Sequence, residues 1–284
     1  MRAIRVTETG EPEVLRIAEL ATPEPGPGQV LVRVEAAGVN FVDTYRRGGL
    51  YPVPLPHTPG TEGAGTVAAL GTGVDTVAVG DRVASVDMVG AYAEYALAPA
   101  DRLVPVPDNV TTRQAAAVLL QGITAHYLVN DSFPVRVGDP VLVHAAAGGV
   151  GLLLTQLAKA AGGQVIATTS TPEKAELARA AGADEVLGYD GFAAQVRKLT
   201  GGEGVAAVYD GIGATTFEES LASLRVRGTL VVYGYASGRP PLFDIDRLQH
   251  LGSLYVTRPT MGHFIRTREE LLARAGALLA AVGD

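Results

Sequence analysis

Cysteine is absent from this 284-residue chain, so disulfides and thiolate metal sites are both excluded. Basic residues are in the minority, because 23 Lys and Arg stand against 30 Asp and Glu, a net charge of -7. That balance, with no basic run, argues against a nucleic-acid surface. The chain also lacks a positively charged start before an apolar stretch. No targeting segment is therefore predicted, and we expect a cytoplasmic protein.

No apolar run is long enough to favour a membrane span. The longest apolar region, 141–154, contains His144 and a group of glycines, which a buried strand followed by a helix explains better. The length and a hydrophobic content of 47% instead indicate a soluble enzyme with two sizeable cores.

The most informative motif is a glycine-rich turn at 145–151. It follows an apolar strand pattern at 140–144 and opens a helix pattern whose apolar residues recur at helical spacing up to Ala161. Such a turn brings backbone N–H groups and the positive end of a helix dipole to a pyrophosphate. A dinucleotide site is therefore predicted, with contacts from Ala147, Gly148, Gly149, Val150 and Gly151. The alternative is an ordinary strand-to-helix turn that binds no nucleotide.

The two halves of the chain have different patterns. Up to about residue 107, short β-type runs alternate with proline and glycine clusters, which predicts a small all-β domain with a helical turn only at 40–47. From about residue 112, strand and helix patterns alternate, which predicts an α/β fold with a doubly wound parallel sheet covered on both faces. The six strand patterns begin near Val141, Gln164, Glu185, Val205, Thr229 and Ser253.

Several segments together resemble one family. They lie at 37–45 (AGVNFVDTY), 59–65 (PGTEGAG), 121–125 (QGITA), 144–151 (HAAAGGVG), 228–234 (GTLVVYG) and 258–259 (RP). In them the chain resembles the quinone oxidoreductases of the zeta-crystallin-like branch of the medium-chain dehydrogenase/reductase superfamily. The resemblance implies a GroES-like catalytic domain, predicted at 1–120, and an NADPH-binding Rossmann domain, predicted at 121–284. It also implies hydride transfer from NADPH to a quinone or a similar conjugated carbonyl.

The resemblance also carries an expectation about the end of the chain. Members of that family continue past the last helix with a segment that returns to the catalytic domain. This chain stops at Asp284. We therefore expect the returning segment to be missing and the first domain to lose the contacts that it supplies.

The turn after the second strand of the dinucleotide unit indicates which nicotinamide cofactor binds. An NAD site usually has an acidic residue there, which accepts from the ribose 2′-OH and repels a 2′-phosphate. Here the run Thr168-Thr-Ser-Thr171 has no carboxylate before Glu173, and Ser170 and Lys174 can bind a phosphate. NADPH is therefore the predicted cofactor. The alternative is a helix cap together with a solvated lysine.

Zinc is not expected. The superfamily's alcohol dehydrogenases hold zinc with cysteine and histidine, but their Gly-His-Glu motif reads Gly60-Thr61-Glu62 here. The five histidines show no metal-ligand spacing and are interpreted as surface or core imidazoles. The predicted chemistry is direct hydride transfer, which needs positioning and apolar surroundings more than a Lewis acid.

Further site residues follow from the resemblance and from the strand ends. The resemblance implies nicotinamide contacts at Asn40, Asp43, Tyr45, Tyr51 and Thr124, all except Asp43 being candidate catalytic residues, and a contact of Tyr189 beside the adenosine phosphate. Because ligands of doubly wound sheets sit beyond the strand ends, Tyr233 and Gly234 are predicted to flank the nicotinamide, and Gly213 is predicted to allow close approach of the cofactor. The alternatives are an Asx turn for Asn40 and a place in the core for the rings of Tyr45 and Tyr51. Either a tyrosine or water donates the proton that follows the hydride.

The last strand pattern, 252–257, would leave an exposed sheet edge. Edge pairing is how the family's dimers form, so a homodimer through this strand is predicted. Two other functions stay open. One is an enone or enoyl-thioester reductase of the same fold, and the other is a non-catalytic NADPH-binding protein, either crystallin-like or RNA-binding. The acidic net charge weakens the RNA version.

Overall fold

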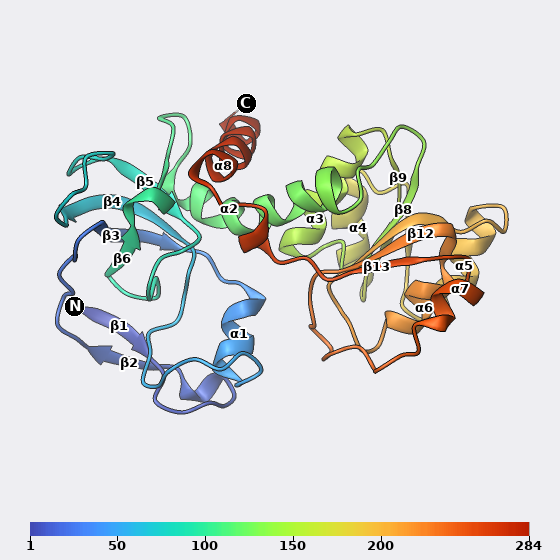
Figure 1. The fold of residues 1–284 in the computed structure, drawn as a ribbon, viewed down its shortest axis with the longest axis horizontal. Helices are drawn as coiled ribbons and strands as arrows, with labels where there is room; N and C mark the ends of the chain where they lie inside the picture. Colours follow the sequence, from blue (N-terminus) through green and yellow to red (C-terminus); the bar gives the residue numbers. More distant parts are fainter. Residues whose placement is uncertain (284) are drawn as a thin grey trace. The chain divides into compact units, whose positions relative to one another are not determined.

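Two units make up the structure, a computed structural model that describes residues 1–283 (Figure 1). The first unit holds Met1–Ile123 together with the residues from Ile265 on, and the second holds Thr124–Phe264. Each unit has its own sheet and hydrophobic core. Within residues 1–283, no helix is long and apolar enough to cross a membrane.

The first unit is built around a five-stranded antiparallel sheet in the order β6-β3-β4-β5-β7. Its apolar residues alternate toward one core, as is usual when an antiparallel sheet buries one face. The sheet strands are β3 (Gln29–Ala37), β4 (Gly63–Leu70), β5 (Arg82–Ser85), β6 (Tyr95–Pro99) and β7 (Val104–Pro105), and β1 (Arg2–Arg5) pairs separately with β2 (Arg16–Glu19). The helical elements are η1 (Pro12–Val14), α1 (Phe41–Arg47), η2 (Ala100–Arg102), α2 (Thr112–Tyr127), which runs on into the second unit, and α8 (Arg268–Gly283).

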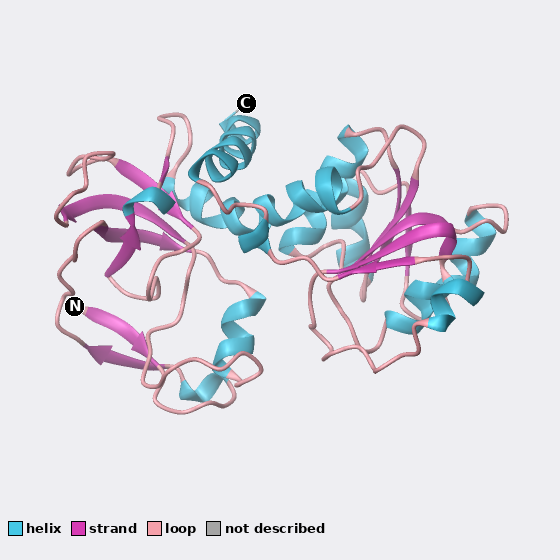
Figure 2. Ribbon diagram, viewed as in Figure 1, coloured by secondary structure: helices cyan, strands magenta, loops and turns pink. Residues whose placement is uncertain are grey.

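The second unit is built around a six-stranded parallel sheet in the order β10-β9-β8-β11-β12-β13. Its strands are β8 (Pro140–Val143), β9 (Gln164–Thr168), β10 (Glu185–Leu187), β11 (Val205–Asp210), β12 (Leu224–Val232) and β13 (Tyr255–Thr257). Its helical elements are η3 (Leu128–Ser132), α3 (Gly149–Ala160), α4 (Pro172–Ala180), α5 (Phe192–Leu199), α6 (Phe217–Ala222), α7 (Asp246–His250) and η4 (Met261–His263). All six predicted strands are present, and Figure 2 shows helices flanking the sheet.

The strand order of this second sheet determines where a ligand binds. Numbered along the chain, the six strands follow the order 3-2-1-4-5-6 of the doubly wound fold, which confirms the predicted fold class. Strand order reverses between β8 and β11, and a crevice opens beyond the carboxyl ends of strands at such a point. The glycine turn follows β8 directly, so it lies at this switch point.

The placement of helix α8 differs from the predicted domain boundaries, which assigned residues 121–284 to the second domain. Residues from Ile265 on belong to the first unit, where the Leu278 side chain lies against Gly122 of α2. The helix buries Leu271, Ala275, Leu278 and Leu279. Helical periodicity shows that such an apolar face exists but not which sheet covers it. The last helix itself therefore returns to the first unit.

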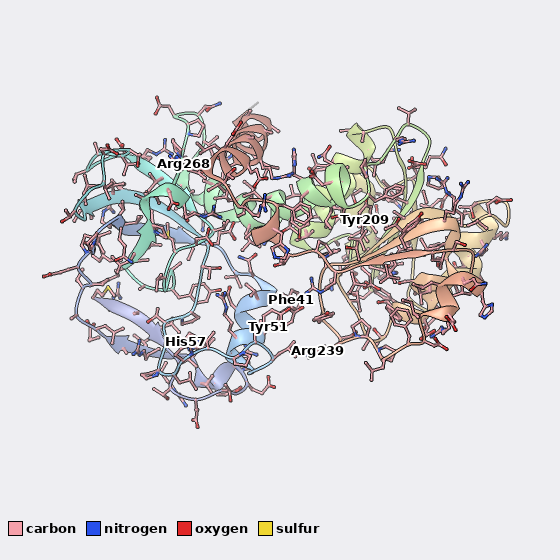
Figure 3. The ribbon with its side chains drawn as sticks, viewed as in Figure 1. Phe41, Tyr51, His57, Tyr209, Arg239 and Arg268 are labelled. Atoms are coloured by element: carbon pink, nitrogen blue, oxygen red, sulfur yellow. The ribbon has the colours of Figure 1, made fainter. Side chains whose placement is uncertain are left out.

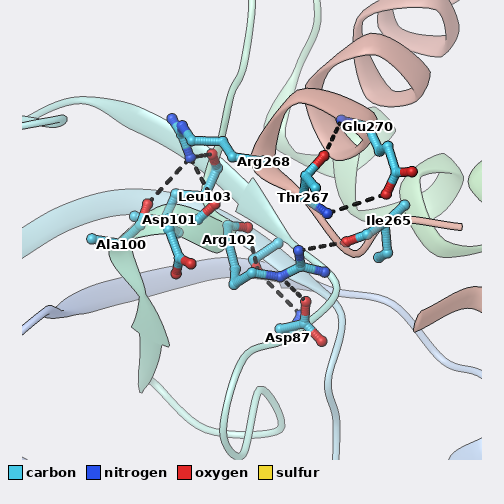
Figure 4. A network of polar contacts seen from close by, with 10 residues as sticks. Asp87, Ala100, Asp101, Arg102, Leu103, Ile265, Thr267, Arg268 and Glu270 are labelled. Atoms are coloured by element: carbon cyan, nitrogen blue, oxygen red, sulfur yellow. Dashed lines mark hydrogen bonds and ion pairs between the residues drawn. The ribbon is translucent and has the colours of Figure 1, made fainter. Parts of the chain in front are cut away.

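Arginine side chains fasten the start of α8 to the first unit (Figure 4). Arg268 Nη1 donates to the carbonyl oxygens of Asp101 at 2.8 Å, Leu103 at 3.1 Å and Ala100 at 3.4 Å. Arg102 donates to the Ile265 carbonyl oxygen at 2.7 Å and to the Asp87 carboxylate at 2.7 Å. The bonds of Arg268, and that between Arg102 and Ile265, join segments that lie more than 160 residues apart in the chain.

Replacing Arg268 with alanine should therefore loosen α8. Because three backbone carbonyls lose a charged donor, we expect the free energy of unfolding to fall by ~1–3 kcal/mol. Urea unfolding measures the change. Arg266→Ala removes an exposed arginine from the same approach to the helix and should change the free energy by less than ~0.5 kcal/mol. Equal losses in both variants would contradict the anchoring role.

Candidate active site

The glycine turn places a helix N-terminus against the end of β8. Ala145 has a left-handed φ of 50°, and Gly148 is the extended residue that precedes α3. A Cβ at Gly151 would stand 2.2 Å from the Ala145 carbonyl oxygen, so only glycine lets the helix pack this closely. Gly148 and Gly149 are exposed, and the first N–H groups of a helix have no partner within it. The turn therefore fits a pyrophosphate.

The turn after β9 carries donors and a positive charge. Lys174 Nζ donates to Ser170 Oγ at 3.1 Å, and both side chains are exposed. Thr171 caps α4, its hydroxyl oxygen accepting the Lys174 N–H at 3.3 Å. A hydrogen bond with the same hydroxyl lowers the pKa of the Glu173 carboxyl. This donor set fits a 2′-phosphate, whereas a bare ribose diol needs an acceptor at this turn.

Tyr189 reaches back to the glycine turn from the segment after β10. Its hydroxyl oxygen accepts the Ala145 N–H at 3.1 Å, and its ring lies 6.2 Å from that of His144. The structure therefore brings Tyr189 to the first residues of the glycine turn.

The three residues predicted after β11 and β12, which are Gly213, Tyr233 and Gly234, lie close to the backbone of other segments. Gly213 has a φ of 93°, and a Cβ there would stand 2.4 Å from the Gly238 carbonyl oxygen. A Cβ at Gly234 would stand 2.6 Å from the Gly211 carbonyl oxygen, and the Tyr233 N–H donates to the Asp210 carbonyl oxygen at 2.8 Å. Close packing of the chain itself therefore requires these glycines, in addition to any approach by a cofactor.

A buried polar network at the same strand ends is not among the predicted site residues. Ser220 donates to Asp210 Oδ2 at 3.0 Å, so its oxygen must accept from His144 Nε2, 2.9 Å away. His144 Nδ1 is then an acceptor for the Thr168 hydroxyl at 2.8 Å. Burial lowers the pKa of His144, which keeps the ring neutral. The network joins the ends of β8, β9 and β11 to α6. Polar residues at the ends of three of the six strand patterns, the first, second and fourth, were the signal available in the sequence.

In the first unit, Asn40 and Asp43 form a buried polar cluster at the start of α1. The Asn40 N–H donates to Asp43 Oδ2 at 3.0 Å, and the Tyr92 hydroxyl donates to the same oxygen at 2.9 Å. The Asn40 amide nitrogen donates to Glu62 at 2.7 Å. Asp43 Oδ1 is buried and has no hydrogen-bond partner within the described residues. Asn40 thus begins the helix and is also held by two carboxylates.

Glu62 is the fully buried carboxylate of this cluster. Its second oxygen accepts the Leu120 N–H at 2.7 Å, and its side chain is 0% exposed. Burial raises the pKa of Glu62 to about 7, and the nearby charge of Asp43 acts in the same direction. Glu62 and Tyr92 are not among the predicted site residues, because their roles depend on contacts distant in sequence.

Three aromatic rings gather along α1 and the segment after it. The rings of Tyr45 and Tyr51 meet edge to face with centroids 5.3 Å apart, and the Phe41 ring lies 6.0 Å from that of Tyr45. Phe41 and Tyr51 are labelled in Figure 3. The Phe41 side chain is 63% exposed although it is apolar, and it was not a predicted site residue. Such rings offer π faces to a planar ligand. The remaining candidate, Thr124, is a buried residue of α2 and the first residue of the second unit.

The residues present do not fit zinc. No cysteine is available, and Glu62 already uses both carboxylate oxygens in hydrogen bonds. Within residues 1–283, no group of three or more His, Cys, Asp or Glu side chains is placed to hold a metal ion.

Comparison with known proteins agrees with both units. Residues 26–108 match the alcohol dehydrogenase GroES-like domain, and residues 149–277 match the family described as zinc-binding dehydrogenase. A quinone oxidoreductase of Pseudomonas aeruginosa is 46% identical over 285 residues, which cover 99% of this chain and 88% of that protein. The chain belongs to the quinone oxidoreductase family.

Two further relatives of this family are informative. A mycobacterial protein whose structure was solved with NADPH is 55% identical, with a TM-score of 0.97 over 99% of this chain and 88% of that one. A 2-haloacrylate reductase of Burkholderia is 41% identical and aligns over 98% of this chain and 86% of its own length. The family therefore includes members named for different electron-poor acceptors.

Proposed function

We propose that the protein is a zinc-independent reductase that transfers hydride from NADPH to a quinone. The observation that carries the proposal is the turn after β9, where Ser170 and Lys174 supply a donor and a positive charge and no acidic residue precedes Glu173. The identity to a quinone oxidoreductase and to a protein solved with NADPH supports the acceptor and the cofactor.

Different residues bind the pyrophosphate, the 2′-phosphate and the nicotinamide. The N–H groups of 147–151 hold the pyrophosphate, Ser170 and Lys174 hold the 2′-phosphate, and Tyr189 packs beside it. When bound, NADPH supplies the hydride. In this proposal the nicotinamide is held by Asn40, Asp43 and Thr124 and flanked by Tyr233 and Gly234. Gly213 allows close approach of the cofactor. Tyr45 and Tyr51 form an aromatic wall for a planar acceptor, and the final proton comes from a tyrosine or from water.

A second candidate substrate is a conjugated acid, enone or enoyl thioester, because a 2-haloacrylate reductase is 41% identical over nearly the whole chain. Steady-state NADPH oxidation with 1,4-benzoquinone, 9,10-phenanthrenequinone, 2-chloroacrylate, an enone and an enoyl-CoA separates these functions. We expect the quinones to give the highest kcat/KM. A preference for the enone or acrylate would assign the acceptor to the second class, and tight NADPH binding without any turnover would favour a non-catalytic protein.

The assembly proposed is a homodimer through residues 252–257. β13 ends the six-stranded order and pairs only with β12 within the described chain, and the Tyr255 side chain on it is 60% exposed. An uncovered strand edge of this kind favours pairing with a second copy. Light scattering at micromolar concentration should give twice the chain mass, whereas a monomer mass would contradict the proposal. The cytoplasmic location is a further proposal, tested by cell fractionation.

A further inference from the structure

The Asn40 amide has a defined orientation because Glu62 holds it. Glu62 Oε2 lies 2.7 Å from the Asn40 amide nitrogen, and Oε1 lies 2.7 Å from the Leu120 backbone nitrogen. An ionised carboxylate can only accept hydrogen bonds. The amide must therefore turn its NH₂ group toward Glu62, which leaves its oxygen pointing away from the carboxylate.

The surroundings of Glu62 keep the carboxylate in place. The side chain is 0% exposed, and the N–H that it accepts comes from within α2 rather than from a helix end. A Cβ at Gly38 would stand 2.0 Å from Glu62 Oε2 and 2.6 Å from the Ala116 carbonyl oxygen. Glycine at 38 thus leaves room for the carboxylate beside the helix backbone, and a larger residue there would displace it.

We propose that Glu62 is a positioning residue that sets which atom of the Asn40 amide is offered to the ligand. This inference rests on the proposed function. When Glu62 is ionised, Asn40 offers its oxygen as an acceptor, for example to a nicotinamide carboxamide. When Glu62 is protonated, its hydroxyl must donate, and neither the Asn40 NH₂ nor the Leu120 N–H can accept. The amide then turns over and offers NH₂ in place of the oxygen.

The groups facing Glu62 set the pH at which this change occurs. The pKa of Glu62 is raised to about 7, because burial, aided by the Asp43 charge, outweighs the lowering effect of hydrogen bonds from Leu120, Asn40 and Leu119. Tyr92, which faces the same cluster, stays neutral because burial and Asp43 raise its pKa. The ionised fraction of Glu62 therefore grows between about pH 6 and about pH 8.

Glu62→Gln tests the inference, because a glutamine imitates the protonated side chain at every pH. Its oxygen keeps the Leu120 N–H, and its NH₂ forces the Asn40 amide to turn over. In the natural protein, kcat/KM and the affinity for NADPH should both rise with pH around a midpoint of about 7. In the variant both should be independent of pH and stay ~10-fold below the natural high-pH values. Glu8→Gln, an exposed residue with the same charge change, should keep the natural profile.

The unfolding of the protein without cofactor gives a second readout. The folded pKa of Glu62 lies above its ordinary value of 4.5, so between these values the folded state holds a proton that the unfolded state releases. Its contribution to the free energy of unfolding therefore falls as pH rises, and Glu62→Gln should remove that fall. A variant that keeps the natural pH profiles of binding and unfolding would overturn the inference. Absence of quinone reduction by the natural protein, with these two profiles as expected, would overturn only the proposed function.

Discussion

Lys174→Glu should reduce kcat/KM for NADPH by ~100-fold, because the 2′-phosphate loses a charged partner and gains a repelling carboxylate. In the structure the Lys174 amine lies 3.1 Å from Ser170 Oγ, and both side chains are exposed at the end of β9. The value for NADH, which has no phosphate there, should change by less than ~3-fold. The preference for NADPH would then largely disappear.

Steady-state kinetics with each cofactor at a fixed quinone concentration measure this change. Lys198→Glu is the matched control, since Lys198 is an exposed lysine of α5 and the change in net charge is identical. It should leave both values within ~2-fold, because an exposed lysine outside the turn after β9 is screened by salt. An equal loss in the two variants would show that overall charge, and not the turn after β9, selects the cofactor.

Gly151→Ala should abolish tight NADPH binding and lower the free energy of unfolding by ~2 kcal/mol or more. The added methyl would meet the Ala145 carbonyl oxygen at 2.2 Å and the Ala146 Cα at 2.7 Å. Both are backbone atoms, so relief requires α3 to move away from the strand end. The N–H groups that hold the pyrophosphate move with the helix.

Urea unfolding and titration with NADPH, followed by its fluorescence, measure the two effects. Gly276→Ala is the control, because Gly276 lies inside α8 and, apart from its chain neighbours and the helix's own backbone, no atom lies within 4 Å of the added methyl. It should stabilise the protein by ~0.5–1 kcal/mol through helix propensity and leave NADPH binding unchanged. Natural affinity in Gly151→Ala would contradict the role given to the turn.

The parts of the fold that could be predicted are those with strong local periodicity. All six strands of the parallel sheet follow from apolar runs, which are properties of neighbouring residues. β2 and β7 were not predicted. The four residues of β2 are mostly exposed, and β7 has two residues, so neither shows an alternating pattern.

The placement of α8 depends on contacts that no local pattern contains. Its apolar face could have covered either sheet, and the choice rests on Arg268 and Arg102 reaching carbonyls far away in the chain. Glu62 was not predicted as a site residue for the same reason. In the sequence it stands only as the last residue of an altered zinc motif, and its importance comes from Asn40 and Leu120, 22 and 58 residues away.

NADPH oxidation by the purified protein with 1,4-benzoquinone, with NADH and an enone measured in parallel, is the decisive assay. We expect rapid quinone reduction that depends on NADPH, with a kcat/KM for NADPH far above that for NADH. Reduction of the enone but not of the quinone, or equal use of both cofactors, would contradict the proposal that this chain is an NADPH-dependent quinone reductase.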